Sequence, residues 1–283
     1  MRSKPKFIFL ALTLITCSAA FTLWKLNHCD KTQQAINNTN FLIMTQWPAP
    51  AGNPQRVHVV GDTDNYRETL KFSRCSLLEK QIITAHSDFG ATLVKSKMTL
   101  TRQTEGKEKG WVMDAISKGS HGTRITAHRY FYTDDLGRIV RMKQKETFNG
   151  ETREQNSWRY HYDDAHRLLR ETLDGDETPQ KHTTEFHYAE NGRLIGATVG
   201  HGTLTLRWDD KGRWLSTESV RETSRAKRVR QQLCSAWDQM GNCTVRNRVV
   251  TEKILNRELS EKIRMRSDIQ FHYEKFNMTW SVD

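Results

Sequence analysis

The stretch from Tyr130 to Ser216 repeats one short pattern: an aromatic residue, an acid, two further residues, a glycine, an arginine and an apolar residue. It reads Tyr-Thr-Asp-Asp-Leu-Gly-Arg-Ile at 132–139, Tyr-Asp-Asp-Ala-His-Arg-Leu at 162–168, Tyr-Ala-Glu-Asn-Gly-Arg-Leu at 188–194, Trp-Asp-Asp-Lys-Gly-Arg-Trp at 208–214 and, beyond the stretch, Trp-Asp-Gln-Met-Gly-Asn-Cys at 237–243. Recurrence at this spacing indicates that one supersecondary unit is used several times.

Each copy predicts a β-hairpin. Aspartate at the first turn position and glycine at the fourth favour a type I turn, because the carboxylate accepts from backbone N–H groups and glycine adopts a positive φ. His166 replaces the glycine of the second copy and belongs to a residue type that tolerates positive φ. The Asn191-Gly192 copy can use a primed two-residue turn instead. The expected turn-forming residues are Asp134, Gly137, Asp163, His166, Asn191, Gly192, Asp209, Gly212, Asp238 and Gly241. Weaker copies at 62–65 and 87–90 place the start of the array near residue 57.

Aromatic residues two positions apart precede three of the turns, at Tyr130 and Tyr132, Tyr160 and Tyr162, and Phe186 and Tyr188. Residues two apart share one face of a strand, and we expect this face to be buried. The histidines between aromatics, His161, His187 and His272, should then face solvent. They would form a metal site only if their strands were neighbours, and plain solvent exposure is the simpler interpretation.

The repeated motif resembles the YD repeat of Rhs-type proteins, whose pattern is Tyr-Asp-x-x-Gly-Arg-Leu. In large Rhs proteins such hairpins wind into a closed shell, and we expect five to seven copies to be too few to enclose a space. The chain also resembles the small, uncharacterised YnfC-type lipoproteins of enteric bacteria, through its mid-chain hairpin, Cys234-Ser235-Ala236-Trp237-Asp238, Asn242-Cys243 and the strand 268–273. This second resemblance implies a location in the cell envelope but no particular function.

The N-terminus has the pattern of an export signal. Arg2, Lys4 and Lys6 precede an apolar run from Phe7 to Trp24, and the positive-inside rule places the body outside the cytoplasm. Cleavage after Ala20, lipidation at Cys17 in a poor lipobox, and retention as a membrane helix all remain open. We expect a bacterial envelope protein on the periplasmic side of the inner membrane, anchored by helix or lipid rather than released.

Three regions follow from this pattern: 1–24 as signal peptide or membrane anchor, 25–56 as a polar, proline-rich tether, and 57–283 as the hairpin domain. Amides followed by Pro48, Pro50, Gly52 and Pro54 are typical of a linker. The apolar residues 41–44 and Trp47 are the exception, and they favour an edge strand or a segment docked on the core.

Four cysteines remain outside the signal, an even number that suits an oxidising compartment. Three pairings are possible, and we favour Cys29 with Cys75 and Cys234 with Cys243. The predicted turn at Asp238 puts Cys243 nearly opposite Ala236, so it would meet Cys234 diagonally, close to the limit of disulfide geometry.

Residues 260–273 alternate strictly between apolar and polar side chains, which predicts a strand with one wet face, paired with 244–254. A helix over 252–262 is the alternative. The chain is polar, with mean hydropathy −0.74, as expected of an antiparallel sheet with one solvated side. We therefore predict an all-β protein of consecutive hairpins that form one twisted open sheet or a sandwich.

The chain carries a net charge of +11. In the cytosol this would indicate nucleic acid, which the export signal excludes, so phospholipid headgroups, lipopolysaccharide or peptidoglycan become the expected anionic partners, beside a partner protein. The densest basic cluster predicts either a solvated loop or short exposed helix, or an anion-binding patch. It consists of Arg221, Arg225, Lys227, Arg228 and Arg230.

The sequence contains no nucleophile elbow, His-Glu-x-x-His motif or phosphate loop, and it indicates no cofactor. The repeated carboxylates are committed to turns. The sequence thus favours a binding or structural role over an enzyme, with an immunity-type protein of a toxin system or an unrecognised envelope hydrolase as alternatives.

Overall fold

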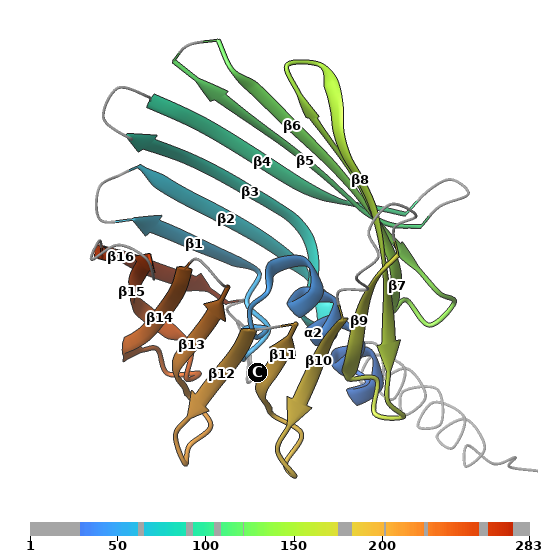
Figure 1. Ribbon diagram of the computed structural model, residues 1–283. Coiled ribbons are helices and arrows are strands. Elements are labelled where there is room, and N and C mark those ends of the chain that lie inside the picture. Colours follow the sequence, from blue (N-terminus) through green and yellow to red (C-terminus); the bar gives the residue numbers. More distant parts are fainter. Residues whose placement is uncertain are drawn as a thin grey trace, which may run out of the picture.

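A computed structural model describes residues 29–61, 65–88, 93–104, 109–120, 122–174, 183–200, 202–223, 226–254 and 260–273. The expected signal segment 1–24, which includes Cys17, and Arg225 lie outside these ranges. So do residues 62–64 and 89–90 of the weak repeats expected at 62–65 and 87–90. The described chain forms one helix, one 3₁₀ turn and sixteen strands (Figure 1). Their bounds are α2 Lys31–Thr45, β1 Arg56–Gly61, β2 Tyr66–Ser73, η1 Arg74–Ser76, β3 Leu77–Asp88, β4 Leu93–Gln103, β5 Gly110–Gly119, β6 Arg124–Thr133, β7 Ile139–Phe148, β8 Glu151–Tyr162, β9 Leu168–Asp174, β10 Thr183–Tyr188, β11 Leu194–Val199, β12 Gly202–Trp208, β13 Trp214–Glu222, β14 Ala226–Trp237, β15 Cys243–Ile254 and β16 Ser260–His272.

The sheet is a closed antiparallel barrel, so the predicted open sheet or sandwich is wrong. Every strand pairs with the next along the chain, and β1 pairs with β16, from Arg56 opposite His272 to Gly61 opposite Ser267. The expectation that so few hairpins enclose nothing is wrong for the same reason, because strands upstream of the clear repeats complete the ring. Among the described strands, closure leaves no unpaired sheet edge.

The predicted hairpin turns are confirmed, and all five lie at one end of the barrel, the turn rim. Gly137, Gly192, Gly212 and Gly241 have φ between 80° and 85°, and His166 takes their place with φ 60°. Each of these residues donates its N–H to the carbonyl three residues earlier, at 2.9–3.1 Å. The expected primed turn at Asn191 is wrong: Gly192 bonds back to Ala189, so this copy makes the same turn as the others.

The terminal hairpin is also confirmed. β15 pairs with β16 from Val245 opposite Asp268 to Lys253 opposite Ser260. The alternative helix over 252–262 is contradicted at both ends by these strands, and 255–259 lie outside the described ranges.

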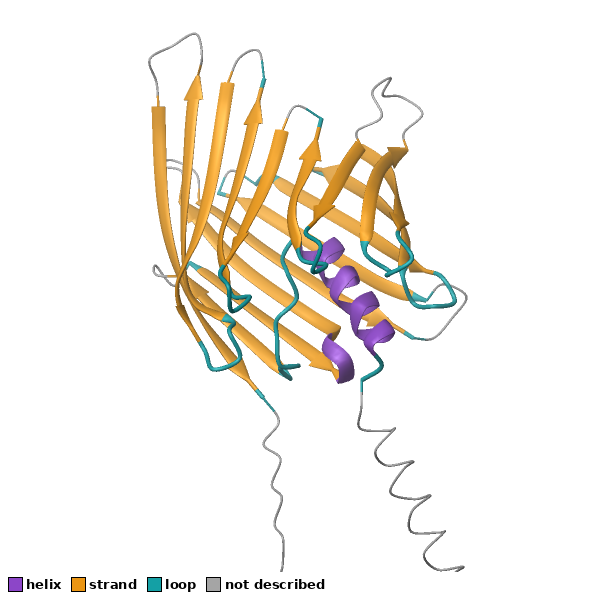
Figure 2. Ribbon diagram, turned by 90° about the horizontal axis from the view of Figure 1, so that it is seen from below, coloured by secondary structure: helices purple, strands orange, loops and turns teal. Residues whose placement is uncertain are grey.

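The segment predicted to be a tether contains helix α2. Asp30 caps it by accepting from the Thr32 N–H at 3.1 Å, and Ile36, Phe41 and Met44 are buried. The helix lies inside the ring of strands at the turn rim (Figure 2). The docking expected for residues 41–44 is therefore confirmed. The linker interpretation of residues 31–45 is wrong, because they form a helix whose Asn37 and Asn40 amides donate to the carbonyls of Cys75 and Gly137.

Inward-facing side chains of the barrel form the core with the helix. Phe41 and Met44 pack with a cluster that includes Val57, Leu70 and Leu100. The expected burial holds for Tyr160 but not for Tyr130, which is 42% exposed while its neighbour Phe131 is 3% exposed. The first copy has an extra residue, Thr133, between its aromatic residue and its aspartate. When Asp134 is aligned with Asp163, Phe131 corresponds to the buried Tyr160.

Over the described residues, no helix has both the length and the apolar character needed to cross a bilayer.

Candidate functional site

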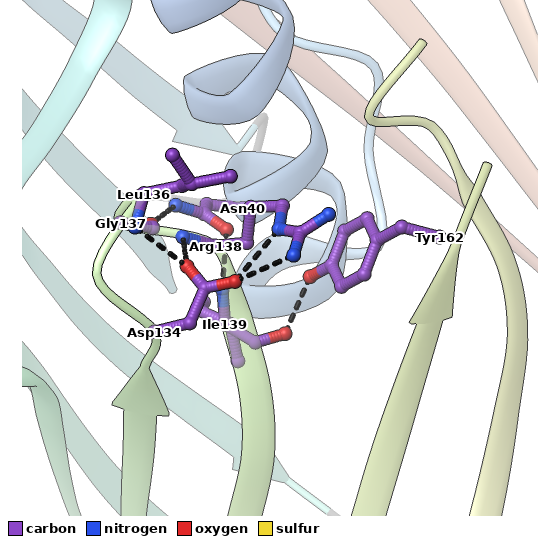
Figure 3. Close-up of polar contacts among 7 residues, drawn as sticks. All are labelled: Asn40, Asp134, Leu136, Gly137, Arg138, Ile139 and Tyr162. Atoms are coloured by element: carbon purple, nitrogen blue, oxygen red, sulfur yellow. Dashed lines mark hydrogen bonds and ion pairs between the residues drawn. The ribbon is translucent and has the colours of Figure 1, made fainter. Parts of the chain in front are cut away.

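The turn rim is held together by contacts that link each repeat to the next. Asp134 Oδ1 accepts from the backbone N–H groups of Leu136 and Arg138, and Oδ2 accepts from Arg138 Nε at 2.8 Å. The Arg138 guanidinium lies over the ring of Tyr162, 5.2 Å from its centroid, and the Tyr162 hydroxyl donates to the carbonyl of Ile139 (Figure 3). One arginine thus joins its own turn to the aromatic residue of the following hairpin.

The same arrangement recurs around the rim. The Arg167 guanidinium lies over Tyr188, whose hydroxyl donates to the Leu168 carbonyl at 3.0 Å. Tryptophan performs the same role in later copies: Trp208 Nε1 donates to the Leu194 carbonyl at 2.8 Å, and Trp237 Nε1 donates to the Trp214 carbonyl at 3.0 Å. The repeated aromatic and arginine residues are therefore structural connectors.

The same contacts lower the pKa of two of the turn aspartates, Asp163 and Asp209. Burial opposes the charge on Asp163, but hydrogen bonds from the backbone and side chain of Arg167 outweigh it and lower the pKa of Asp163. The backbone N–H of Arg213 has the largest effect in lowering the pKa of Asp209. These carboxylates fix turns, which leaves them no proton to transfer at neutral pH.

The last repeat has asparagine in place of the arginine, and this asparagine contacts the segment between α2 and β1, the helix loop. Asn242 replaces arginine and donates to Asp238, to the Tyr273 hydroxyl and to the Ala51 carbonyl, while its Oδ1 accepts from the Ala51 N–H at 2.7 Å. Ala51 belongs to the segment between α2 and β1, so the rim contacts run from the last hairpin into the helix loop.

Inside the barrel, next to the helix, lies a cavity of about 220 Å³. Its walls are mainly apolar and come from α2, the 47–51 loop, β1, β2, β16 and the turns of the last two repeats. The lining includes Phe41, Trp47, Val57, Val59, Leu70, Phe72, Trp208, Trp214, Ile269 and Phe271, with Glu68 and Arg246 among the polar members. Glu68 is already bonded, by the Tyr66 hydroxyl at 2.7 Å and by Gln81 Nε2 at 2.6 Å.

Arginines share the inner face with this cavity. Residues opposite one another in an antiparallel ladder lie on the same face. Arg248 pairs with Met265 and with Gln232, and Met265 alternates down β16 to the core residues Ile269 and Phe271. By the same pairing, Arg230 and Arg246 also face inward, and Arg246 lies over the Trp47 ring at 4.7 Å from its centroid.

The outer face carries rows of directly opposed cations. Arg56, Lys71 and Lys80 pair across β1–β3; Lys95, Lys118 and Arg124 pair across β4–β6; Arg141 pairs with Arg159. All of these except the half-buried Lys80 are exposed. Like charges directly opposite one another destabilise a sheet, so the two rows of three cations have a cost that packing does not explain. The repulsion between Arg141 and Arg159 is offset, because Asp174 Oδ2 contacts Arg159 Nε at 2.5 Å.

The predicted basic cluster at 221–230 is neither a loop nor a short helix over its described residues, which lie in β13 and β14. Alternation divides it: Lys227 points outward and contacts Glu222 at 3.2 Å, whereas Arg228 and Arg230 point inward. The patch expected on one surface is thus split between two faces.

The three candidate histidines are exposed, as predicted, but they lie on β8, β10 and β16, which are not neighbours. Within the described ranges, no group of three or more His, Cys, Asp or Glu side chains could hold a metal ion.

Both predicted disulfides are present. Cys29 pairs with Cys75 at a Cα–Cα distance of 5.3 Å, which ties the segment before α2 to the β2–β3 connection. Cys234 pairs with Cys243 at a Cα–Cα distance of 5.7 Å. Cys243 lies opposite Trp237, and the β-bulges between Cys234 and Trp237 shift the register so that the diagonal bridge can form.

Sequence reasoning missed the inward arginines and the helix amides. Arg246, Arg248 and Val250 alternate along one face of β15, which is a signal that could have been found. Asn40, which is 1% exposed, lies in the helix that we predicted to be a linker.

No family model matches this chain, and no curated protein matches it significantly. Among solved structures, a porin-like protein from Bacteroides uniformis ATCC 8492 is similar, with a TM-score of 0.46 and 12% identity over 79% of this chain and 99% of that one. A second, TcdB2-TccC3 without its hypervariable C-terminal region, has a TM-score of 0.26 and 9% identity, covering 70% of this chain and 14% of that chain. Likenesses at this level do not establish a family or a function.

Proposed function

We propose that this is an exported, anchored cell-envelope protein whose barrel binds an anionic envelope surface, with the phosphates of lipid headgroups as the contacted groups. The single observation that carries this proposal is the set of opposed cation rows on the outer wall from β1 to β8. A surface of phosphates would relieve the repulsion within each row and release counterions.

The composition of the wall also favours water and headgroups over the lipid interior. Membrane-spanning barrels present an apolar band about 25 Å tall to lipid. Here the outward positions of β4 are Leu93, Lys95, Lys97, Thr99, Thr101 and Gln103, of which all but Leu93 are polar. The basic wall would therefore lie beside a membrane surface, held there by the N-terminal segment.

A binding role agrees better with the geometry than hydrolysis does. A glycoside hydrolase requires two carboxylates about 5 to 9 Å apart in one cleft. Of the described residues that line the interior cavity, Glu68 is the carboxylate, and it is already bonded to Tyr66 and Gln81.

The test is the salt concentration that elutes the full chain, kept in a non-ionic detergent, from phosphocellulose. Replacing Lys95, Lys118 and Arg124 together by glutamine should lower this concentration clearly. The matched control replaces Arg170, Arg207 and Arg264, which are exposed, lie outward on β9, β12 and β16, and face no lysine or arginine in the described pairings, and it should elute nearer the wild type. Equal shifts in the two variants would show that only net charge matters and would reject the proposed surface.

A parallel sedimentation with insoluble peptidoglycan separates the two anionic partners. Retention on phosphocellulose without sedimentation supports lipid phosphates. If the variant of Lys95, Lys118 and Arg124 no longer sediments with peptidoglycan but elutes from phosphocellulose like the wild type, the basic wall binds peptidoglycan and not lipid phosphates.

A further inference from the structure

The interior cavity is large enough and apolar enough for a small hydrophobic ligand. An apolar cavity of about 150 Å³ already admits benzene, and this one measures about 220 Å³. Trp47 and Trp214 meet edge to face within the lining, at 5.7 Å between ring centroids. Three tryptophans, Trp47, Trp208 and Trp214, bound the space together with aliphatic residues of β1, β2 and β16.

A basic cluster lies directly beyond this apolar space. Arg246 belongs to the cavity lining, and Arg248 and Arg230 follow on the inner face towards the opposite end of the barrel. Because residues two apart in a strand are about 7 Å apart, the cluster begins at the cavity and continues away from the helix. An elongated ligand could therefore contact apolar walls at one end and arginines at the other.

The cluster has unsatisfied polar atoms. Arg248 Nε and Gln232 Oε1 are buried without a hydrogen-bond partner, and the two residues lie directly opposite each other on β14 and β15. Burial, followed by the charges of Arg230 and Arg246, lowers the pKa of Arg248. The positive charges of Arg230 and Arg246 lie near Arg248 on this inner face. An unpaired buried donor such as Arg248 Nε is costly until a ligand occupies it.

We propose that the barrel interior binds an anionic amphiphile with a single acyl chain, a fatty-acid carboxylate, with the chain in the tryptophan-lined cavity and the carboxylate at Arg246 and Arg248. Charge complementarity selects the carboxylate, since the planar guanidinium matches two carboxylate oxygens. The size of the cavity selects a chain of medium length. Glu68 also lines the cavity, and its two carboxylate oxygens accept from the Tyr66 hydroxyl and from Gln81 Nε2. This site is on the opposite face of the wall from the surface proposed above and does not depend on it.

The experiment uses the full chain as the cell exports and processes it, in a buffer free of alkyl detergents. Terminally brominated decanoate is titrated and the tryptophan fluorescence is followed, because bromine quenches the indoles that line the cavity. Saturable quenching is expected for the wild type. Arg248→Gln should weaken the apparent affinity at least tenfold, while Arg264→Gln, an exposed position on the outer face of the adjoining strand β16, should not change it.

Brominated decanol and brominated decylamine complete the test. Both should bind the wild type more weakly than decanoate, and Arg248→Gln should leave decanol binding unchanged, which shows that the variant is folded and its cavity intact. Equal affinity for the carboxylate and the amine, equal losses in the two arginine variants, or no saturable quenching would each overturn the proposal.

Discussion

The guanidinium of Arg167 lies over the ring of Tyr188, 4.9 Å from its centroid, although the two residues belong to successive hairpins. The same guanidinium contacts Asp163 Oδ2 through its Nη2 atom at 2.6 Å within its own turn. Each repeat therefore stabilises its own turn and the next hairpin with one side chain.

Replacing Arg167 by alanine should lower the free energy of unfolding by about 1–2 kcal/mol, since it removes a partly exposed cation–π contact and a hydrogen-bonded ion pair. Urea denaturation followed by tryptophan fluorescence measures the change. Arg170→Ala, an exposed position on the outer face of β9, is the control and should change stability by less than about 0.5 kcal/mol. A similar loss in both variants would contradict the linking role.

Asn40 joins α2 to the first repeat turn, donating to the Gly137 carbonyl at 2.8 Å and accepting from the Ile139 N–H at 2.9 Å (Figure 3). Asn40→Leu should cost about 2–4 kcal/mol, because both backbone groups lose their partner in a buried place. The exposed Asn38 on the same helix provides the matched variant, Asn38→Leu, which should be nearly neutral. Thermal unfolding by circular dichroism compares them, and equal melting temperatures would show that the helix is not fastened at Asn40.

The two disulfides should differ in what they contribute. The chain-entropy model gives about 4 kcal/mol for the Cys29–Cys75 bridge, with its sequence separation of 46, and about 2.6 kcal/mol for Cys234–Cys243, with 9. Cys29→Ser with Cys75→Ser should therefore lower the denaturation midpoint more than the other pair of substitutions. A non-reducing gel of the exported protein should show a mobility shift on reduction, and its absence would contradict both bridges.

Acid should weaken the turn rim. The pKa values of Asp163 and Asp209 are lowered in the folded chain, so their stabilising effect is complete above the unfolded value of about 3.9 and is lost as the pH falls through the lower folded value. Denaturation midpoints measured between pH 7 and pH 2.5 should fall mainly below pH 4. Asp163→Asn should be less stable than the wild type at pH 7 and show a shallower fall. A fall of the same size in the variant would exclude Asp163 as a contributor.

The repeated pattern made the turns predictable because each depends on a few neighbouring residues: an aspartate that accepts local N–H groups and a glycine or histidine at positive φ. Strand alternation likewise made the terminal hairpin predictable. The favoured pairing of the four cysteines is confirmed, although the predicted turn placed Cys243 only diagonally opposite Cys234. The first aromatic pair was misassigned because one inserted residue, Thr133, changes which side chains face inward.

Local sequence alone fixed the turns, most of the strands and the polar character of the outer wall. Tertiary structure decided closure, since the pairing of β1 with β16 joins opposite ends of the domain and has no local signature. It also decided the role of residues 31–45, since the Thr39 hydroxyl and the Asn40 amide donate to the carbonyls of His166 and Gly137 in turns far along the chain. The placing of Arg246 and Arg248 beside an apolar cavity was decided in the same way. Long-range pairing and burial depend on which surfaces meet, and no short stretch of residues specifies that.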